Sequence, residues 1–563
     1  MELREDLTIG KMLTETVERY ADRTAVEYMG RTWTYGELDR ISDKIAQEML
    51  AMGIRKGSKA GIWANDRPDT LFCFLSLEKL GAVPVMFNTS WTFGEVQARV
   101  DEIGVEYLFY DEGYRGLDFV QAVREKTVSV PRAAVYLKDG GWQGFSGGIE
   151  SYIGRRNFVG GIESGAGKAG FAGETESDAG RVDFAGEAEC GADRLECAKA
   201  AVTPRDTDMI LFTSGSTGAP RGVLTTHYSR SNNARAQAAM VKADCRDVFL
   251  VAIPMFHCFS MSGNILAAMA VGACICFPES RRTAHLLSAV ERAGVTVLTA
   301  VPTLFSALLA NERRAQYNTG TLRTGLVGGA GCPRALFEAV SRELHMELLP
   351  SLGQTEATAG ITAGRYEDPI ELRALSAGYA VEHLELRIVD LENGTSLPTG
   401  ESGELCIRGY SVMQGYYNQP ELTAQTIDGE GFLHTGDLGR LDKDGRLYLT
   451  GRKKELIIRG GENIAPGEIE SVLLSDDRIS QVKVIGIPDA HYGEEVCACV
   501  VCTSPGSLTE ADIRHLAGAK LAYYKVPRYV VFLEQMPLLG NGKTDTAKLK
   551  CSLSNLGAGT SGL

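Results

Sequence analysis

The sequence predicts an α/β protein: a large N-terminal domain of parallel sheets flanked by helices, a small β-rich subdomain, and a small α+β domain at the C-terminal end. Two observations predict this architecture. Short apolar runs alternate with helical patterns through the first part of the chain, which is typical of parallel strands covered by helices. Beyond residue 377 the runs become shorter and richer in turn residues, and beyond residue 452 helices and short strands mix.

Length and composition narrow the class of protein. A chain of 563 residues exceeds what one hydrophobic core usually organises, so we expect several structural units. No run approaches the roughly 18 apolar residues of a membrane span, and the N-terminus lacks the apolar stretch of an export signal. We therefore expect a cytoplasmic protein without integral membrane contact. The net charge of −14 disfavours nucleic acid as a partner.

The first elements follow from local signals. Short strands are expected over residues 25–28 and 31–34, and a capping box of Thr34 and Glu37 starts the helix that follows. Gly53 ends that helix. The alternation then continues with a strand over 60–64, a helix over 68–80 and a strand over 82–87.

Two segments depart from the globular pattern. Between about residues 139 and 200, glycine, alanine, glutamate and serine dominate without sustained hydrophobic periodicity, which indicates an inserted, mobile surface segment. A partner-docking element is the alternative for this insert. Residues 551–563 are rich in glycine and serine and are expected to form a disordered tail.

From Met209 the strand and helix alternation resumes. Glycine, proline, serine or threonine follows each expected strand. In an open parallel sheet, ligands bind at the carboxyl ends of the strands, so these loops are the expected walls of a site. The strands are expected over residues 248–253, 273–277, 295–300, 325–327 and 347–349.

The stretch Thr213–Gly222, TSGSTGAPRG, follows the apolar run 208–212 and has the composition of a phosphate-binding loop. Its glycines allow the backbone N–H groups to approach an anion, its hydroxyls donate hydrogen bonds, and Arg221 adds a planar positive charge. The spacing is not that of G-x-x-x-x-G-K-[ST], which disfavours a P-loop GTPase or kinase. A flexible surface turn is the alternative for such a loop taken alone.

Thirteen cysteines raise the question of disulfides or metal sites. Most lie in apolar, strand-like runs such as VCACVVC, where they resemble small buried hydrophobic residues. Cys499 and Cys502 form a C-x-x-C, but the alternation of a strand would direct them to opposite faces. We therefore expect no redox or zinc site there.

Six motifs in order resemble the adenylate-forming superfamily, which includes acyl-CoA synthetases, firefly luciferase and the adenylation domains of peptide synthetases. Behind the phosphate loop these are PMFH ending at His257, VGGAG at 327–331, LGQTE at 352–356, HTGD ending at Asp437, GRKKE from Gly451, and GNGKTD containing Lys543. The resemblance covers nearly the whole chain apart from the insert and tail. It implies an N-terminal adenylate-forming domain over 1–452 and a mobile C-terminal domain over 453–550.

The resemblance also implies an activity and its cofactors. A small-molecule carboxylic acid would react with ATP to give an acyl adenylate and pyrophosphate, and the acyl group would then pass to coenzyme A, as in fatty-acid metabolism. Glu356 would hold Mg²⁺, since hard cations prefer oxygen ligands. Lys543 would bridge the carboxylate and the α-phosphate, and His257 would lie beside the acyl pocket, although a core histidine is its alternative.

The remaining site residues are assigned from the same resemblance. Asp437 would accept both ribose hydroxyls, with Arg452 beside ribose or phosphate, and the glycines after the Lys454 hinge would line the pantetheine tunnel. The full set of expected nucleotide and CoA contacts is Thr213, Ser214, Gly215, Ser216, Thr217, Gly218, Arg221, Gly329, Ala330, Gln354, Thr355, Asp437, Arg452, Gly460 and Gly461.

Three positions depart from the family pattern. Arg221 replaces a more usual lysine, Leu352 replaces an aromatic residue that stacks on adenine, and the arginine usual after the Lys543 position is missing. The second departure puts the nucleotide affinity in question rather than the nucleotide itself.

Alternatives remain for the acceptor and for the class of protein. The chain has no acid near PMFHCFS to hold a substrate ammonium, which disfavours a peptide-synthetase domain. A free-standing enzyme that loads a separate carrier protein is the main rival to a CoA ligase. A catalytically inactive nucleotide-binding regulator would not need both Glu356 and Lys543. The walls expected for the acyl pocket, at 257–263, 301–303 and 327–329, are apolar or small and suit an aliphatic or aromatic acid. A homodimer is compatible with the sequence.

Overall fold

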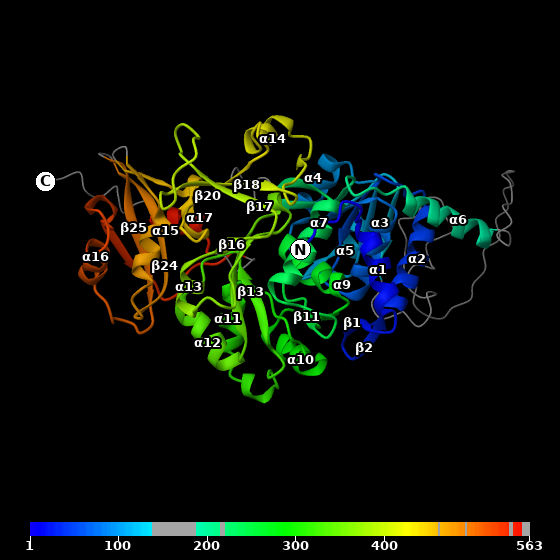
Figure 1. The fold of residues 1–563 in the computed structure, drawn as a ribbon, viewed down its shortest axis with the longest axis horizontal. Coiled ribbons are helices and arrows are strands. Elements are labelled where there is room, and N and C mark those ends of the chain that lie inside the picture. The colour runs from blue at the N-terminus through cyan, green and yellow to red at the C-terminus, as the bar shows by residue number, and fades with distance from the viewer. Residues whose placement is uncertain (138–186, 214–219, 460–461, 490–491, 540–543, 554–563) are drawn as a thin grey trace.

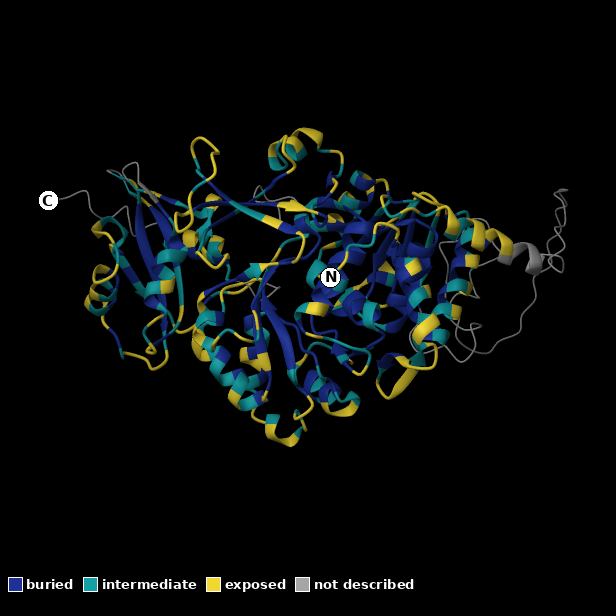
Figure 2. Cartoon of the chain, in the orientation of Figure 1, coloured by how far each residue is buried: buried dark blue, intermediate teal, exposed yellow. Residues whose placement is uncertain are grey.

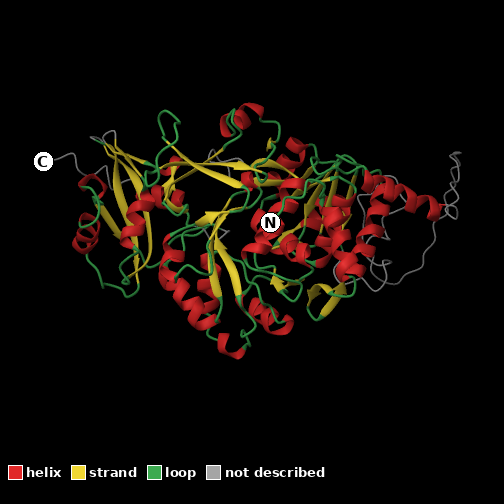
Figure 3. Cartoon of the chain, in the orientation of Figure 1, coloured by secondary structure: helices red, strands yellow, loops and turns green. Residues whose placement is uncertain are grey.

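The computed structural model describes residues 1–137, 187–213, 220–459, 462–489, 492–539 and 544–553. The molecule is elongated (Figure 1), with the sheets of the N-terminal domain forming its larger body and the last unit lying at one end beyond β20. Helices and strands alternate through the larger body (Figure 3), which confirms the α/β class.

A seven-stranded sheet carries the first half of the N-terminal domain. Its order is β19-β10-β9-β4-β3-β5-β8, and the strands from β9 to β8 are parallel neighbours. Strand β10 pairs antiparallel with β9 and β19, so the chain reverses at this edge. The strands are β3 (Lys59–Trp63), β4 (Val83–Met86), β5 (Tyr107–Tyr110), β8 (Ala133–Tyr136), β9 (Thr207–Thr213), β10 (Arg221–Thr226) and β19 (Gly415–Tyr416).

Helices cover both faces of this sheet. The α3 helix is buried along its whole length because the seven-stranded sheet lies on one side and α2 and the β1–β12 region share the same core on the other. Residues of α4 and α5 pack with Trp63 and Ile210 on the opposite face. The expected capping box of Thr34 and Glu37 starts α2. These helices are α1 (Ile9–Tyr20), α2 (Tyr35–Ala51), α3 (Pro68–Lys79), α4 (Phe93–Ile103) and α5 (Phe119–Arg124).

A four-stranded sheet leads into the second half of the domain. Its order is β11-β12-β1-β2, with only the β1–β2 hairpin antiparallel. The expected strand over 295–300 forms isolated parallel bridges instead, in which Val297 joins Phe249 to Thr324. The strands are β1 (Thr24–Tyr28), β2 (Arg31–Thr34), β11 (Val248–Leu250) and β12 (Cys274–Phe277). The helices around them are α7 (His227–Met240), α8 (Cys258–Ser260), the π-helix η2 (Met261–Leu266), α9 (Ala267–Val271), α10 (Thr283–Ala293) and α11 (Pro302–Leu309).

An eight-stranded sheet contains the expected β-rich subdomain. Only its first pair, β13 with β14, is parallel, and the remaining strands pair antiparallel. In sheet order the strands are β13 (Thr324–Gly328), β14 (Glu347–Gly353), β15 (Gly360–Ala363), β16 (Gly378–Ala380), β21 (Arg446–Arg452), β20 (Leu433–Leu441), β18 (Gly403–Gly409) and β17 (Leu384–Val389). The helices here are α12 (Arg334–Leu344), the short η4 (Thr355–Ala357), α13 (Ile370–Leu375) and α14 (Pro420–Thr426).

The last unit has its own five-stranded sheet, which begins after the turn η5 (Lys453–Glu455). Two apolar clusters cover its faces, and the long β24–β25 hairpin contributes to both. Cys499 packs in one cluster and Cys502 against the other, which confirms that they point to opposite faces. The elements are β22 (Ile457–Arg459), β23 (Glu462–Ile464), α15 (Pro466–Leu473), β24 (Ile479–Asp489), β25 (Gly493–Cys502), α16 (Glu510–Gly518), β26 (Tyr529–Phe532) and α17 (Thr546–Leu553).

Two segments expected to lack structure are partly helical. The end of the insert forms α6 (Glu187–Ala200), which packs on α2 with Leu195 buried, while Lys199 binds Asp43 at 2.8 Å. Composition did not predict this helix, because it buries only a short apolar surface around Leu195. The expected tail begins too early, because α17 continues to Leu553 and buries Leu549. Figure 2 shows exposed residues in the part of α6 that follows residue 192.

No helix in the described part of the chain has the length and apolar character needed to cross a membrane.

Candidate adenylation site

The expected phosphate loop connects β9 and β10, which pair as antiparallel neighbours. Thr213, the last residue of β9, pairs in register with Arg221, the first of β10, so the two lie on either side of the turn. Ser214, Gly215, Ser216, Thr217 and Gly218 lie outside the described residues. The pairing of β9 with β10 places Thr213 and Arg221, two described residues of this motif, side by side at the carboxyl end of β9.

Glu356 lies in the short turn η4 between β14 and β15, next to this hairpin. The hydroxyl of Tyr416 donates a hydrogen bond of 2.9 Å to its Oε1, and the backbone N–H of Met413 donates to its carbonyl, also at 2.9 Å. The guanidinium of Arg221 lies 5.7 Å from the centre of the Tyr416 ring. The expected anion-binding arginine and the expected metal ligand therefore meet at one tyrosine.

Tyr416 itself was not found from the sequence. Its pKa is raised by burial first and by the charge of Glu356 second, so its hydroxyl remains a donor to the carboxylate. The run GYYN within MQGYYNQP was the available signal, since aromatic residues after a glycine suit a short edge strand. Nothing in the run shows which ring faces the site.

The LGQTE and PMFH motifs also meet. The hydroxyl of Thr355 lies 3.7 Å from the sulfur of Cys258, the residue after His257, and burial raises the pKa of that thiol. The half-buried His257 ring lies 4.6 Å from the ring of Phe256, and His257 is the residue before α8. Gln354 donates its backbone N–H to Ala359 at 3.0 Å, which closes the loop around Glu356. The π-helix η2 begins directly after α8, and π-helical turns are common at functional sites.

The VGGAG motif ends β13 where backbone and ring approach closely. A Cβ on Gly328 would lie 2.5 Å from the carbonyl oxygen of Ser351, its partner in register, and 3.6 Å from the Phe259 ring. Gly329 has a φ of +82°, and a Cβ there would lie 3.5 Å from Val301. Gly329 and Ala330 are exposed, as a surface for a planar ligand requires. The three sequence stretches expected as acyl-pocket walls thus lie together.

Asp437 and Arg452 face each other on β20 and β21. They are partners in register, and the Arg452 Nε lies 2.7 Å from Asp437 Oδ1. The aspartate side chain is 5% exposed, whereas the arginine is 41% exposed. The carboxylate is therefore held by a cation that still reaches solvent. Lys453, the next residue, lies 2.9 Å from Glu404 Oε2.

Three of the expected site residues belong to the last unit of the chain. Lys543, Gly460 and Gly461 lie outside the described residues. Strand β22 precedes the glycine pair and β23 follows it, and the two strands are antiparallel partners.

A buried ionic centre behind the hairpin also escaped the sequence analysis. Arg230 and Asp208 form an ion pair with both side chains fully buried. Arg230 also donates to Thr225 at 2.6 Å and to Ser262 in η2 at 3.1 Å. Its remaining contact, at 3.5 Å, is the carbonyl of Thr358, a β-branched residue at φ +66° just after the Glu356 turn. One side chain thus ties the β9–β10 hairpin, the π-helix η2 and the Glu356 loop together.

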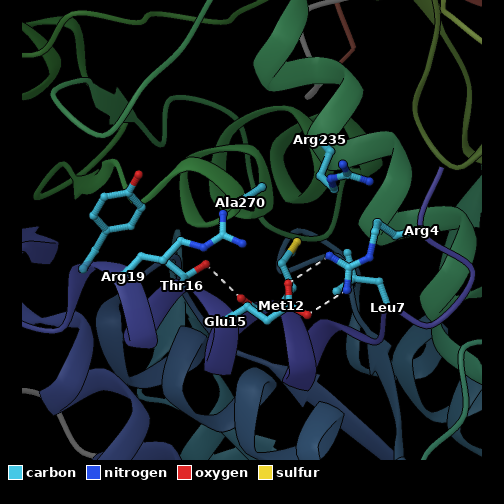
Figure 4. Close-up of a pocket in the computed structure, with 9 residues that line it drawn as sticks. Arg4, Leu7, Met12, Glu15, Thr16, Arg19, Arg235 and Ala270 are labelled. Carbon is cyan, nitrogen blue, oxygen red and sulfur yellow. Dashed lines mark hydrogen bonds and ion pairs between the residues drawn. The ribbon is translucent and has the colours of Figure 1, made fainter. Parts of the chain in front are cut away.

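A surface pocket lies apart from these motifs, between the N-terminal segment, α1, α7 and α9 (Figure 4). Arg4, Arg19 and Arg235 point toward it. Arg4 is already neutralised by Glu15 at 2.7 Å and Asp6 at 2.8 Å. The pocket therefore offers much less net positive charge than three arginines suggest.

The acids, histidines and cysteines that the structure describes do not gather in groups of three or more that could hold a metal ion. Among the described residues, Glu356 belongs to no such group.

Comparisons with known proteins cover the whole architecture. The family model "AMP-binding enzyme" matches residues 13–417, and "AMP-binding enzyme C-terminal domain" matches residues 468–543. YngI of Bacillus subtilis, named as an acyl-CoA synthetase, is 33% identical, with 96% of each chain covered. The acyl-CoA ligase sidI of Aspergillus fumigatus is 32% identical, covering 97% of this chain and 91% of its own.

Solved structures give the same fold. ATP-bound MatB from Rhodopseudomonas palustris superposes with a TM-score of 0.78 at 23% identity, covering 97% of this chain and 99% of its own. A fatty acyl CoA synthetase of Mycobacterium tuberculosis gives 0.71 at 26% identity, covering 98% and 99%. The chain therefore belongs to the AMP-binding enzymes of the adenylate-forming superfamily and, within it, to the acyl-CoA synthetases, which are AMP-forming acid–thiol ligases.

Proposed function

We propose that this protein activates an aliphatic or aromatic carboxylic acid with ATP and transfers the acyl group to coenzyme A through the residues described above. In the first step a carboxylate oxygen attacks the α-phosphorus and pyrophosphate leaves; in the second the CoA sulfur attacks the acyl carbon and AMP leaves. The observation that carries the proposal is the junction of Arg221, Tyr416 and Glu356, which joins a phosphate-type hairpin to a carboxylate at hydrogen-bond distance.

Charge distribution supports a division of roles. Arg221 lies at the start of β10, beside the loop proposed to bind the polyphosphate of ATP. Its guanidinium can neutralise the phosphate charge and donate several hydrogen bonds. Asp437, held by Arg452, is proposed to accept the ribose hydroxyls. Gly329 and Ala330, exposed at the end of β13, are proposed as the surface for the adenine, with Gln354 and Thr355 closing the phosphate side. Lys543, Gly460 and Gly461 remain proposals from the resemblance alone.

A magnesium ion fits the Glu356 carboxylate. Tyr416 occupies Oε1, and among the described residues no hydrogen bond is donated to Oε2, so one hard oxygen is available for a cation. When bound, Mg²⁺ would neutralise phosphate charge during adenylation. Glu356→Gln should lower pyrophosphate exchange by about 10² or more without unfolding the protein, because it removes the charge and keeps the shape.

The acid is proposed from the walls of the pocket. Phe259, Val301 and the two glycines after Val327 are apolar or small, which favours a hydrocarbon acyl group over a charged one. A cytoplasmic location and a homodimer are further proposals, testable by cell fractionation and by light scattering of the purified chain.

The decisive experiment separates the two half-reactions. ATP–pyrophosphate exchange with a panel of acids should identify the acid, and thioester formation should then require CoA. Lys543→Ala should slow adenylate formation by about 10²–10³ yet convert pre-formed acyl adenylate and CoA at close to the normal rate. Gly461→Leu should do the converse. Loss of both half-reactions in both folded variants would contradict domain alternation, and thioester formed only on a carrier protein would identify that acceptor instead.

A further inference from the structure

The main chain of Tyr416 is held by its neighbours, and its side chain is buried. It pairs with Val223 of β10, its own N–H donates to the Thr423 hydroxyl at 2.9 Å, and its side chain is 6% exposed. Gly415 before it has a φ of +150°, and a Cβ there would lie 2.7 Å from the Thr423 methyl group. The ring therefore has little freedom to turn away from the site.

The two ends of this ring contact two different functional groups. At the hydroxyl, the hydrogen bond to Glu356 Oε1 is 2.9 Å long and leaves the second oxygen of the carboxylate aimed elsewhere. At the face, the Arg221 guanidinium lies within the roughly 6 Å at which a cation is attracted to an aromatic ring. A hydrogen bond to a charged group is among the stronger ones, and a ring contact adds to it.

We propose that Tyr416 is a positioning residue that orients Glu356 for its metal ion and supports Arg221 of the phosphate hairpin, so that metal and phosphate binding are coupled through one side chain. This inference rests on the proposed function, because it assumes that Glu356 holds a divalent cation with the nucleotide. It goes beyond that function by assigning a role to a residue that acts through Glu356 and Arg221.

Two substitutions at this position separate its two contacts. Tyr416→Phe removes only the hydroxyl, whereas Tyr416→Leu removes the hydroxyl and the ring. The chain also offers a matched control, Tyr417→Phe. The Tyr417 hydroxyl donates to the Ile103 carbonyl at 2.9 Å and accepts from Lys59 at 2.8 Å, so it makes comparable hydrogen bonds away from Glu356.

The primary measurement is binding, with the full-length protein and a non-hydrolysable ATP analogue. Calorimetry is performed with the analogue in EDTA and in Mg²⁺, and Mn²⁺ binding to the protein–analogue complex is followed by electron paramagnetic resonance. Tyr416→Phe should weaken Mn²⁺ binding about 10-fold and leave analogue binding in EDTA unchanged. Tyr416→Leu should weaken both, because Arg221 loses its ring. Tyr417→Phe should change neither.

A second arm uses Glu356→Gln as background. If Tyr416 acts through Glu356, Tyr416→Phe added to Glu356→Gln should cause no further loss of Mn²⁺ binding, since contacting residues are not additive. Wild-type Mn²⁺ binding in Tyr416→Phe, or equal losses in Tyr416→Phe and Tyr417→Phe, would overturn the proposal. Failure of the wild type to form any thioester would instead overturn the proposed function, and the binding measurements would still decide the role of Tyr416.

Discussion

Two arginine–aspartate ion pairs of the N-terminal domain differ in how far their side chains are exposed to solvent. The side chains of Arg230 and Asp208 are both fully buried. Arg452, the last residue of β21, is 41% exposed, and it pairs with the buried Asp437. The first pair has its remaining donors bound by protein, to Thr225, Ser262 and Thr358. The second leaves part of its cation facing solvent. We therefore expect the buried pair to hold the framework, and we propose that the exposed pair serves a ligand.

Breaking the buried pair should have the largest effect. Arg230→Met leaves Asp208 as an uncompensated buried charge, so we expect unfolding free energy to fall by about 3–5 kcal/mol. Denaturant unfolding measures the loss. Adding Asp208→Asn to Arg230→Met should restore part of it, because the unpaired charge disappears. Equal stability of the wild type and Arg230→Met would show that the pair is not structural.

The stability of the same buried region should depend on pH through His227, the first residue of α7. Burial lowers its pKa to about 4, outweighing the opposite effect of Asp208, and its Nδ1 accepts from the N–H of Ile9 at 3.4 Å. The unfolded chain binds a proton near pH 6.5, so stability from this group is present above pH 6.5 and is lost as pH falls toward 4. The loss should reach roughly 3 kcal/mol.

The neighbouring Glu78 acts in the opposite direction. It is fully buried, its Oε2 lies 3.2 Å from His227 Nδ1, and burial raises its pKa well above the ordinary value. Its contribution is therefore largest at low pH and is lost as pH rises through the raised pKa. Comparing the pH dependence of wild type and His227→Gln isolates the histidine; a constant difference between pH 4 and 7 would contradict its assignment.

The sequence was sufficient for the fold class, because strand alternation and the capping box at Thr34 are local signals. It was insufficient for Arg230 and Tyr416. Arg230 contacts Thr358, 128 residues away, and Tyr416 contacts Glu356, 60 residues away, and only the assembled sheets bring these partners together. Helix α6 was missed for a related reason. Leu195 and Lys199 are unremarkable in a glycine-rich segment until α2 lies beside them.

This difference can be tested within the insert. Replacing residues 140–186 with a short Gly/Ser linker should preserve stability and thioester formation, because their composition buries little core. Extending the replacement to 198 removes Leu195 and should cost about 2 kcal/mol, the order of one buried leucine. Thermal unfolding of both variants measures this. A tenfold loss of activity in the shorter replacement, with the protein still folded, would reveal a function in the insert itself.

The smallest effect on stability should come from the exposed pair. Arg452→Ala removes a half-exposed cation beside the buried Asp437, so the unfolding free energy should change by much less than in Arg230→Met, where both side chains are fully buried. If Arg452 instead serves the nucleotide, the same substitution should weaken binding of an ATP analogue about 10-fold, which corresponds to roughly 1.4 kcal/mol. Lys453→Ala is the control, because that side chain is similarly exposed and pairs with Glu404 rather than Asp437.

A stability loss as large as that of Arg230→Met, or equal nucleotide affinities in Arg452→Ala and Lys453→Ala, would contradict the division between a framework pair and a ligand pair. Unchanged stability together with weakened binding in Arg452→Ala alone would show that exposure, rather than the identity of the pair, separates the two roles.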